Sequence, residues 1–265
     1  MAKEILGNEQ FHIKLKKGDV GRYVLLPGDP KRAKLISEYF DNPVEVSNNR
    51  EYAIYNGYLD GELVTVCSTG IGGPSTAIAV EELANIGAHT FIRVGTCGGM
   101  NLDVEAGDLV IATGAIRMDG TSREYAPMEF PAVSNFEVCS SIIEGAKSLK
   151  LKHHVGVVQS KDSFYGQHSP ETKPVYYELQ NKWNAWLRLG CLASEMESST
   201  LFTVASYRKV KAGALFLCIN NQERQKQGLS NELFEDVDLV IKAGIEALKI
   251  QIKKDKEQKK LLGGV

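Results

Sequence analysis

The chain has no long apolar run and no excess of positive charge, and its cysteines are too few and odd in number for a full set of disulfide pairs. Its apolar segments are short and interrupted, and the first ten residues, MAKEILGNEQ, contain no apolar core of a secretory signal. We therefore expect a cytoplasmic protein without a membrane partner. The formal net charge is -2, with charged residues spread along the chain. This excludes the broad basic face that duplex nucleic acid requires, so no nucleic-acid partner is expected.

Cysteine and histidine usage also narrows the possible chemistry. The five cysteines are odd in number and widely spaced, and several lie in apolar runs, which predicts free thiols. The five histidines show no metal-ligand spacing with one another or with cysteine, so we expect no zinc site. Cys97 has no evident histidine partner in the sequence, which disfavours it as a catalytic nucleophile.

Apolar periodicity along the 265 residues predicts alternating strands and helices in one domain spanning residues 1–265. Strands are expected near 23–27, 52–58, 62–68, 90–95, 107–117, 154–159 and 212–219. Helices are expected over 31–40, 74–87, 134–149, 172–188, 197–207 and 231–254. Such alternation indicates an α/β fold with a mostly parallel sheet and ligands at the carboxyl ends of strands. The lysine-rich residues 254–265 are expected to form a frayed tail.

Three strand ends carry glycine beside arginine or hydroxyl groups. Residues 68–83, STGIGGPSTAIAVEEL, pass from a strand through three glycines into a helix that Ser75 can cap, which is a geometry that favours a bound anion. Residues 25–35, LLPGDPKRAKL, repeat the arrangement, and residues 91–100, FIRVGTCGGM, place Arg93 inside an apolar strand. A buried arginine requires an anionic partner, either a bound phosphate or an internal carboxylate.

These segments resemble the nucleoside phosphorylases of the uridine and purine type, and the likeness runs nearly end to end. It rests on FHIKL at 11–15, LLPGDPKR at 25–32, NNREY at 48–52, the 68–83 segment, RVGTCG at 93–98, DSFYGQ at 162–167 and SEMESST at 194–200. The resemblance implies a single-domain α/β fold whose mixed, twisted sheet partly closes into a barrel covered by helices. It implies inorganic phosphate as co-substrate without a required cofactor, and a homo-oligomer of at least a dimer, with a trimer of dimers expected.

The resemblance also implies a role for each residue at a matching position. Phosphate binding falls to Gly28, Arg32, Arg50, Arg93 and Thr96. Ribose binding falls to His12, Thr96, Glu195, Met196 and Glu197. Base binding falls to Gly98, Phe164, Gln167, His168, Ile219 and Gln222. A potassium ion between subunits is implied for Glu51, Ile71 and Ser75. The neighbouring subunit is expected to supply Arg50 and His12. Taken alone, Arg32 and Arg50 would be solvated surface charges, and a surface position is the alternative for His12.

The expected reaction requires groups that bind phosphate, bind the sugar and stabilise the departing base. Guanidinium forks such as that of Arg93 match phosphate oxygens and hold the nucleophile at the sugar carbon C1′. A carboxylate at Glu197 fixes the ribose hydroxyls and lies where positive charge develops, although helix capping is the alternative role for Glu195 and Glu197. Gln167 offers a donor and an acceptor to an imide edge.

The sequence departs from the family pattern at the base. The family reads glycine, glutamine, any residue, arginine, whereas this chain has Ser169 at the arginine position, and Gln222 stands where a second arginine is expected. We hypothesise that Lys161 replaces the lost positive charge, with His168 as a second possibility. The expected catalytic set is therefore Arg93, Glu197, Lys161 and Gln167.

The base itself is predicted to be a pyrimidine. Purine-specific relatives are expected to carry an acidic residue near 220–222, whereas this chain has Asn220, Asn221 and Gln222, and an amide is not a general acid. The predicted reaction is reversible phosphorolysis of uridine to uracil and ribose 1-phosphate in pyrimidine salvage. The alternatives are a purine nucleoside phosphorylase, a nucleosidase of the same fold that uses water, and a non-catalytic nucleoside-binding protein. A dinucleotide-binding fold is disfavoured because GIGGPS lacks the required glycine spacing.

Overall fold

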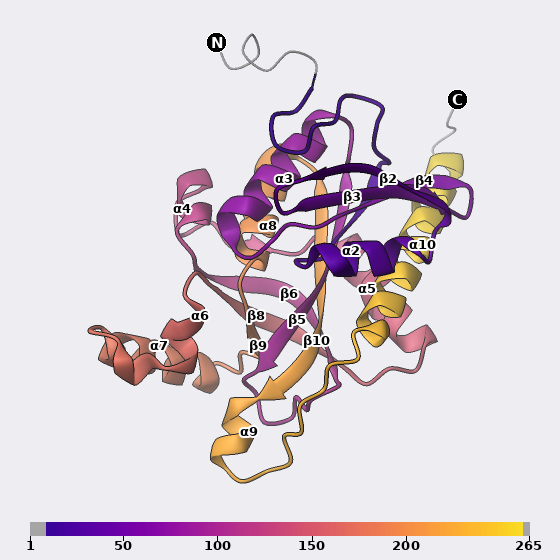
Figure 1. Cartoon of the computed structure of the whole chain (residues 1–265). Coiled ribbons are helices and arrows are strands. Elements are labelled where there is room, and N and C mark those ends of the chain that lie inside the picture. The colour runs from indigo at the N-terminus through magenta and orange to yellow at the C-terminus, as the bar shows by residue number, and fades with distance from the viewer. Residues whose placement is uncertain (1–8, 262–265) are drawn as a thin grey trace.

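The computed structural model describes residues 9–261, and its strands form one mixed sheet. The strands are β1 (Tyr23–Leu26), β2 (Asp41–Asn49), β3 (Tyr52–Leu59), β4 (Glu62–Cys67), β5 (Thr90–Gly99), β6 (Leu109–Met118), β7 (Ala132–Val133), β8 (His153–Lys161), β9 (Ala193–Glu195) and β10 (Lys211–Asn221). The helices are α2 (Pro30–Ser37), α3 (Gly73–Asn85), α4 (Thr121–Tyr125), α5 (Phe136–Ser148), α6 (Phe164–His168), α7 (Tyr176–Arg188), α8 (Ser198–Arg208), α9 (Gln222–Lys226) and α10 (Asp238–Leu261), with a 3-10 turn η1 at Pro170–Thr172. Figure 1 shows this arrangement.

Five strands of this sheet close into a barrel. Neighbouring strands pair in the order β5, β10, β6, β8 and β9, and β9 pairs back onto β5 through Gly98 with Ser194 and Gly99 with Ala193. The edge of β5 that meets β9 at residues 98–99 pairs earlier, over residues 90–93, in parallel with β1, and the sheet continues from β1 to β4, β3 and β2. The mixed sheet partly closed into a barrel is therefore confirmed, and β5 belongs to both of its parts.

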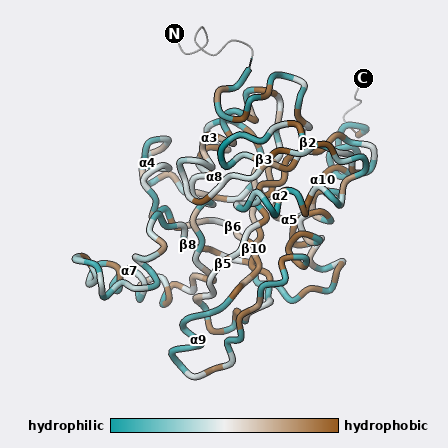
Figure 2. Tube along the Cα trace, viewed as in Figure 1, coloured by the Kyte–Doolittle hydropathy of each residue, from teal (hydrophilic) through white to brown (hydrophobic). Residues whose placement is uncertain are grey.

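Helices cover the two faces of the sheet and bury separate apolar clusters. One cluster packs β5 through Phe91 against α3 and α8, while the other packs it through Ile92 and Val94 against α2, α5 and α10. Figure 1 shows α3 and α8 on the opposite side of the central strands from α5 and α10. In Figure 2 the hydrophobic colour gathers where the central strands meet α5 and α10, and α7 is largely hydrophilic. Burial on both faces explains the nearly continuous apolar run of β5.

The predicted elements recur with shifted ends, and some segments differ. The polar strand β2 was not predicted because its edge position leaves most of its side chains exposed. The helix predicted over 231–254 is wrong at its start, since α10 begins at Asp238, and it continues to Leu261. Lys254, the first residue of the predicted tail, lies within α10, and its Nζ pairs with Glu144 Oε1 at 2.6 Å. The fraying expected for 254–265 stays a prediction, and residues 262–265 lie outside the described part of the chain.

Two further expectations concern the whole chain. All five cysteines are buried free thiols, as predicted. Within residues 9–261 no helix combines the length and the apolar character that a membrane crossing takes.

Candidate active site

A cavity of about 800 Å³ opens at the carboxyl ends of β1 and β5, beside the first turn of α2. It brings together most of the residues that the sequence marked. Those lining it from the predicted set are Gly28, Arg32, Ile71, Arg93, Thr96, Gly98, Lys161, Phe164, Gln167, His168, Glu195, Met196, Glu197 and Ile219. Asp29, Pro30, Gly70, Cys97, Ser194 and Asn220 complete the lining.

Two glycine turns pack on one another at the floor of this cavity. The Gly70 N–H donates to the Gly28 carbonyl at 2.9 Å. A Cβ on Gly28 would lie 3.2 Å from the Gly70 oxygen and 3.8 Å from Arg93 Nη2, so a side chain there would crowd both the turn and the guanidinium. Asp29 caps α2 by accepting from the Lys31 N–H, and Pro30 begins the helix. Glycine and cap together place Arg32 over the carboxyl end of β5.

Arg93, which is buried, and Arg32, which is half-buried, form a cationic pair with unmet donors. Arg93, 5% exposed, donates from Nη2 to Glu197 Oε2, and its Nε lies 3.7 Å from Glu195 Oε2. Arg93 Nε, Arg93 Nη1 and Arg32 Nε have no hydrogen-bond partner among the described residues. Burial lowers the pKa of Arg32, and the neighbouring Arg93 charge lowers that pKa further. The internal salt bridge considered for Arg93 exists, yet it leaves donors that an anion can satisfy.

The two glutamates of SEMESST have different surroundings. Glu195 accepts from Ser160 Oγ and from the Glu197 and Ser198 N–H groups, so it caps the start of α8. Burial raises the pKa of Glu195, and the charge of Glu197 adds to that increase. Glu197 instead accepts from the Gly72 N–H at 2.7 Å and from Arg93. The capping interpretation therefore holds for Glu195, whereas Glu197 joins the glycine turn to the cationic pair.

The start of α3 differs from the prediction. Ser75 was expected to cap this helix, but it lies inside the first turn, and its hydroxyl is 3.4 Å from the Ile71 and Gly72 carbonyls. The N-cap residue is Gly72, which has a φ of 93° that favours glycine and no capping side chain. Its N–H is satisfied by Glu197, the residue that precedes the distant α8, so the turn is completed by a tertiary contact.

Lys161 ends β8 as a buried ammonium at the predicted base end of the cavity, the end that Phe164, Gln167 and His168 also line. Its Nζ donates to Ser194 Oγ at 2.7 Å, and Ser194 Oγ also lies 2.6 Å from Gln167 Oε1. Burial lowers the pKa of Lys161 to about 8. The Phe164 and His168 rings stand 4.2 Å apart between centroids on α6, and burial lowers the pKa of His168 with a further contribution from the Lys161 charge. An apolar ring, an amide and a cation thus meet at one end.

Sequence comparison adds to this geometry. The family model of the phosphorylase superfamily matches residues 22–250. The chain belongs to the phosphorylase superfamily. It is 54% identical to the uridine phosphorylase of Treponema pallidum (strain Nichols) over 246 residues, which cover 93% of this chain and 95% of that protein. It is 43% identical to the uridine phosphorylase of Thermococcus kodakarensis over 253 residues, covering 95% and 90%. A guanosine phosphorylase of Halorubrum lacusprofundi is 41% identical over 207 residues, covering 78% and 81%.

This phosphorylase superfamily member keeps several predicted residues away from its own cavity. His12 is held by Glu82, whose carboxylate accepts from His12 Nδ1 at 2.7 Å and from the His12 and Ile13 N–H groups. Arg50 occupies the turn between β2 and β3 with a left-handed φ of 55°. The predicted potassium ligands gather around Gly70, where an added Cβ would lie 3.1 Å from Glu51 and 3.6 Å from Ser75 Oγ.

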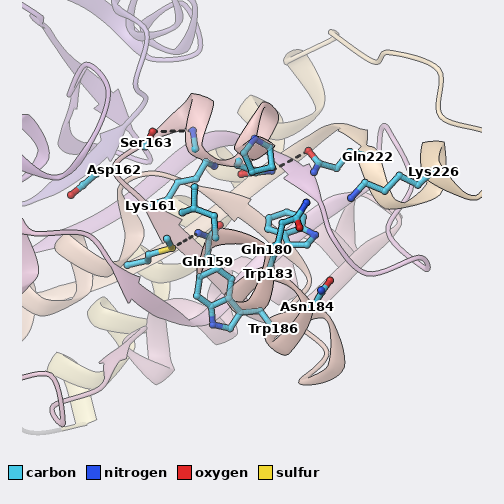
Figure 3. A pocket seen from close by; sticks show the side chains of 15 residues that line it. Gln159, Lys161, Asp162, Ser163, Gln180, Trp183, Asn184, Trp186, Gln222 and Lys226 are labelled. Carbon is cyan, nitrogen blue, oxygen red and sulfur yellow. Dashed lines mark hydrogen bonds between the residues drawn. The ribbon is translucent and has the colours of Figure 1, made fainter. Parts of the chain in front are cut away.

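A second cavity of about 340 Å³ lies behind the base end in this superfamily member. It shares Lys161 and Gln167 with the larger cavity, and Gln222 lines it together with Trp183 and Trp186. Figure 3 shows Lys161 and Gln159 among the side chains that surround this space, with the two tryptophans of α7. Gln222 therefore lies beside the predicted base site rather than in the larger cavity, 3.5 Å from Gln167 Nε2. No sequence motif indicated this cavity, although α7, which lines it, follows closely on the segment that contains Lys161 and Gln167.

Proposed function

We propose that the protein is a uridine phosphorylase, which converts uridine and inorganic phosphate reversibly to uracil and ribose 1-phosphate. Several relatives carry that name, and the uridine phosphorylase of Treponema pallidum is 54% identical over 93% of this chain. The observation that carries the proposal is the pair of guanidiniums, buried Arg93 and half-buried Arg32, with unmet donors beside Glu197 in one cavity. A nucleosidase that uses water needs no such pair.

Phosphate binds between Arg32 and Arg93 in this proposal. Arg93 Nε and Nη1 and Arg32 Nε are the open donors, and Gly28 and Thr96 line the same end of the cavity. Guanidinium groups accommodate phosphate oxygens in a fixed geometry, so the anion is held as a nucleophile against C1′ without covalent chemistry. Burial and then the Arg93 charge lower the pKa of Arg32, and a bound anion offsets the second of these effects.

The ribose lies against Met196 and Glu197. The Glu197 carboxylate has lone pairs beyond those used by Gly72 and Arg93, and these accept from the vicinal hydroxyls. Its negative charge stabilises the positive charge that the sugar acquires when the bond to the base breaks. Glu195 acts indirectly, because its oxygens hold the N-terminus of α8 and thereby orient Glu197.

The base lies between Phe164 and Ile219, with Gln167 and Lys161 at its polar edge. Lys161 has one hydrogen-bond partner within residues 9–261, Ser194, so it keeps donors for a carbonyl oxygen of the base. The ammonium stabilises the uracil anion as it leaves and replaces the arginines absent at Ser169 and Gln222. His168 stacks near Phe164 and closes the same end of the cavity.

The proposal includes an assembly of at least a dimer, and a trimer of dimers as the full form. Its support is that His12 and Arg50 lie outside the lining of their own cavity, although the predicted chemistry gives them a 5′-hydroxyl and a phosphate to bind. A neighbouring subunit would present both. A potassium ion at Glu51, Ile71 and Ser75 between subunits, and action in the cytoplasm without a required cofactor, belong to the same proposal.

A guanosine phosphorylase is the second candidate. Two observations favour it, namely the 41% identity to the Halorubrum lacusprofundi protein and the cavity of about 340 Å³ behind the base end. A purine is one ring longer than uracil, and a leaving purine benefits from a proton donor. Lys161, with a pKa of about 8, is a suitable acid near neutral pH.

One assay decides among these functions. The purified protein is incubated with uridine, thymidine, cytidine, inosine, guanosine and adenosine, each with and without phosphate, and free base and ribose 1-phosphate are quantified. Fastest release from uridine that requires phosphate supports the proposal, and fastest release from guanosine supports the second candidate. Release without phosphate indicates a nucleosidase, and binding without release indicates a nucleoside-binding protein. The Glu197→Gln variant, expected to lose turnover, controls for contaminating activity.

A further inference from the structure

Ser194, which has no role of its own above, lies at the centre of a polar cluster that joins Lys161 and Gln167 to Gln159. It lies on β9 directly opposite Gln159 of β8, and its side chain is almost fully buried. Its Oγ is within hydrogen-bond distance of three groups, Lys161 Nζ, Gln159 Oε1 and Gln167 Oε1. The hydroxyl therefore connects the buried cation to the amide that faces the base.

A count of protons constrains this cluster. A serine hydroxyl has one proton and two lone pairs, and an ammonium can only donate. Lys161 therefore occupies one lone pair of Ser194. The hydroxyl then donates to one amide oxygen and accepts from the amino group of the other amide. Gln159 and Gln167 must consequently present opposite ends to Ser194.

The surroundings of the two amides indicate which one turns. Gln159 Nε2 faces Met118 Sδ at 3.2 Å, and a thioether is a weak acceptor, so turning this amino group toward Ser194 sacrifices little. Gln167 Nε2 by contrast has an acceptor to lose, Gln222 Oε1 at 3.5 Å, and its second N–H can still face Gly98, where an added Cβ would lie 3.9 Å from Nε2. With Gln159 donating to Ser194, the serine proton goes to Gln167 Oε1, and the Gln167 amino group points to the base end.

We propose that Ser194 is a specificity-determining positioning residue, which holds the Gln167 amide in the orientation that reads uracil and rejects cytosine; this inference rests on the proposed uridine phosphorylase function. Uracil presents an N3–H donor next to a carbonyl acceptor, and the second lone pair of Gln167 Oε1 with Nε2 matches that order. Cytosine presents an N3 acceptor next to an amino donor, which requires the reversed amide. Without the serine proton the amide turns freely and accepts both bases.

The test compares uridine with cytidine in the intact protein. In the Ser194→Ala variant, kcat/KM for uridine with saturating phosphate is expected to fall about tenfold, as for one lost hydrogen bond of typical strength. The value for cytidine is expected to hold or rise, so the uridine to cytidine ratio falls by at least that factor. A general effect on Lys161 or on folding would lower kcat/KM for uridine and for cytidine by the same factor and would leave their ratio unchanged.

Three further variants test whether the Ser194 hydroxyl proton sets the ratio of uridine to cytidine activity. Ser194→Cys keeps the side-chain size but donates weakly, so it should lower the ratio as Ser194→Ala does. Ser194→Thr retains the hydroxyl and should restore the ratio. Gln159→Leu is the matched control, because Ser194 still donates to Gln167 and the ratio should stay at the wild-type value. An unchanged ratio in Ser194→Ala and Ser194→Cys, while the wild type phosphorolyses uridine, overturns the inference alone. A wild type that releases no uracil overturns the proposed function as well.

Discussion

Replacing Lys161 by methionine should lower activity and raise stability in the same protein. Methionine keeps the length and apolar stem of the side chain but removes the charge at the base end of the cavity. Loss of one donor to a developing anion typically costs about 10² to 10³ in kcat. The buried ammonium is itself unfavourable, since its pKa falls from 10.5 to about 8. A shift of that size corresponds to about 3 kcal/mol at neutral pH, so Lys161→Met should unfold at higher temperature.

The pH dependence has a defined sign. The protonated ammonium is the active form, so kcat should be level at neutral pH and fall as pH rises through about 8. The folded protein binds fewer protons than the unfolded chain between about pH 8 and about pH 10.5, so the free energy of unfolding should increase with pH across that window. Lys161→Met should lose both dependences.

The assay measures initial rates of uracil release at saturating uridine and phosphate across this pH range, together with thermal unfolding. Lys226→Met is the matched control, because Lys226 lines the second cavity but is exposed and paired with Glu223 at 2.7 Å. This control should keep the wild-type profile. A Lys161→Met variant that retains the wild-type kcat, or that retains the decline above pH 8, would refute the assignment of the cation.

Three further predictions follow from other contacts. Arg32→Ala should raise the KM for phosphate about 10- to 100-fold with little change in the KM for uridine, because a charged hydrogen-bond donor is lost; equal effects on both substrates would contradict this. Gly73→Ala should cost about 1 to 3 kcal/mol of stability in thermal unfolding, since its Cβ would lie 2.6 Å from Thr200 Oγ1; an unchanged melting temperature would show that the site relaxes. Glu82→Gln should lower kcat/KM for uridine more than for 5′-deoxyuridine, because it loosens the hold on His12; parallel losses would argue against that role.

The fold could be predicted where burial leaves a periodic signal. The strand at β5 was marked by apolar residues that the structure buries on both faces. The closed barrel was expected only from resemblance, because β9, which completes it, spans three residues and carries no periodicity. The helix start before α10 was placed too early, since residues 231–237 have apolar spacing that the structure does not use in a helix.

The candidate site could be predicted where a residue type is costly to bury. Arg93 in an apolar strand indicated an anion, and the structure places it with Arg32 and Glu197 around one cavity. The role of Ser194 could not be found in this way, because it depends on the register that sets β9 beside β8. A serine in a polar segment has no distinguishing pattern, and its contacts come from elements far apart in the chain.

The ring of five strands is fastened at β9 by two residue pairs with β5. Opening that junction would separate Gly98 from Ser194 and Gly99 from Ala193. A nucleoside that contacts both β5 and β9 would stabilise this pairing. Binding of the nucleoside should therefore slow amide hydrogen exchange at the β9–β5 junction more than in the central strands. Nucleoside binding and opening of the β9–β5 junction would then be linked, because binding would favour the closed barrel.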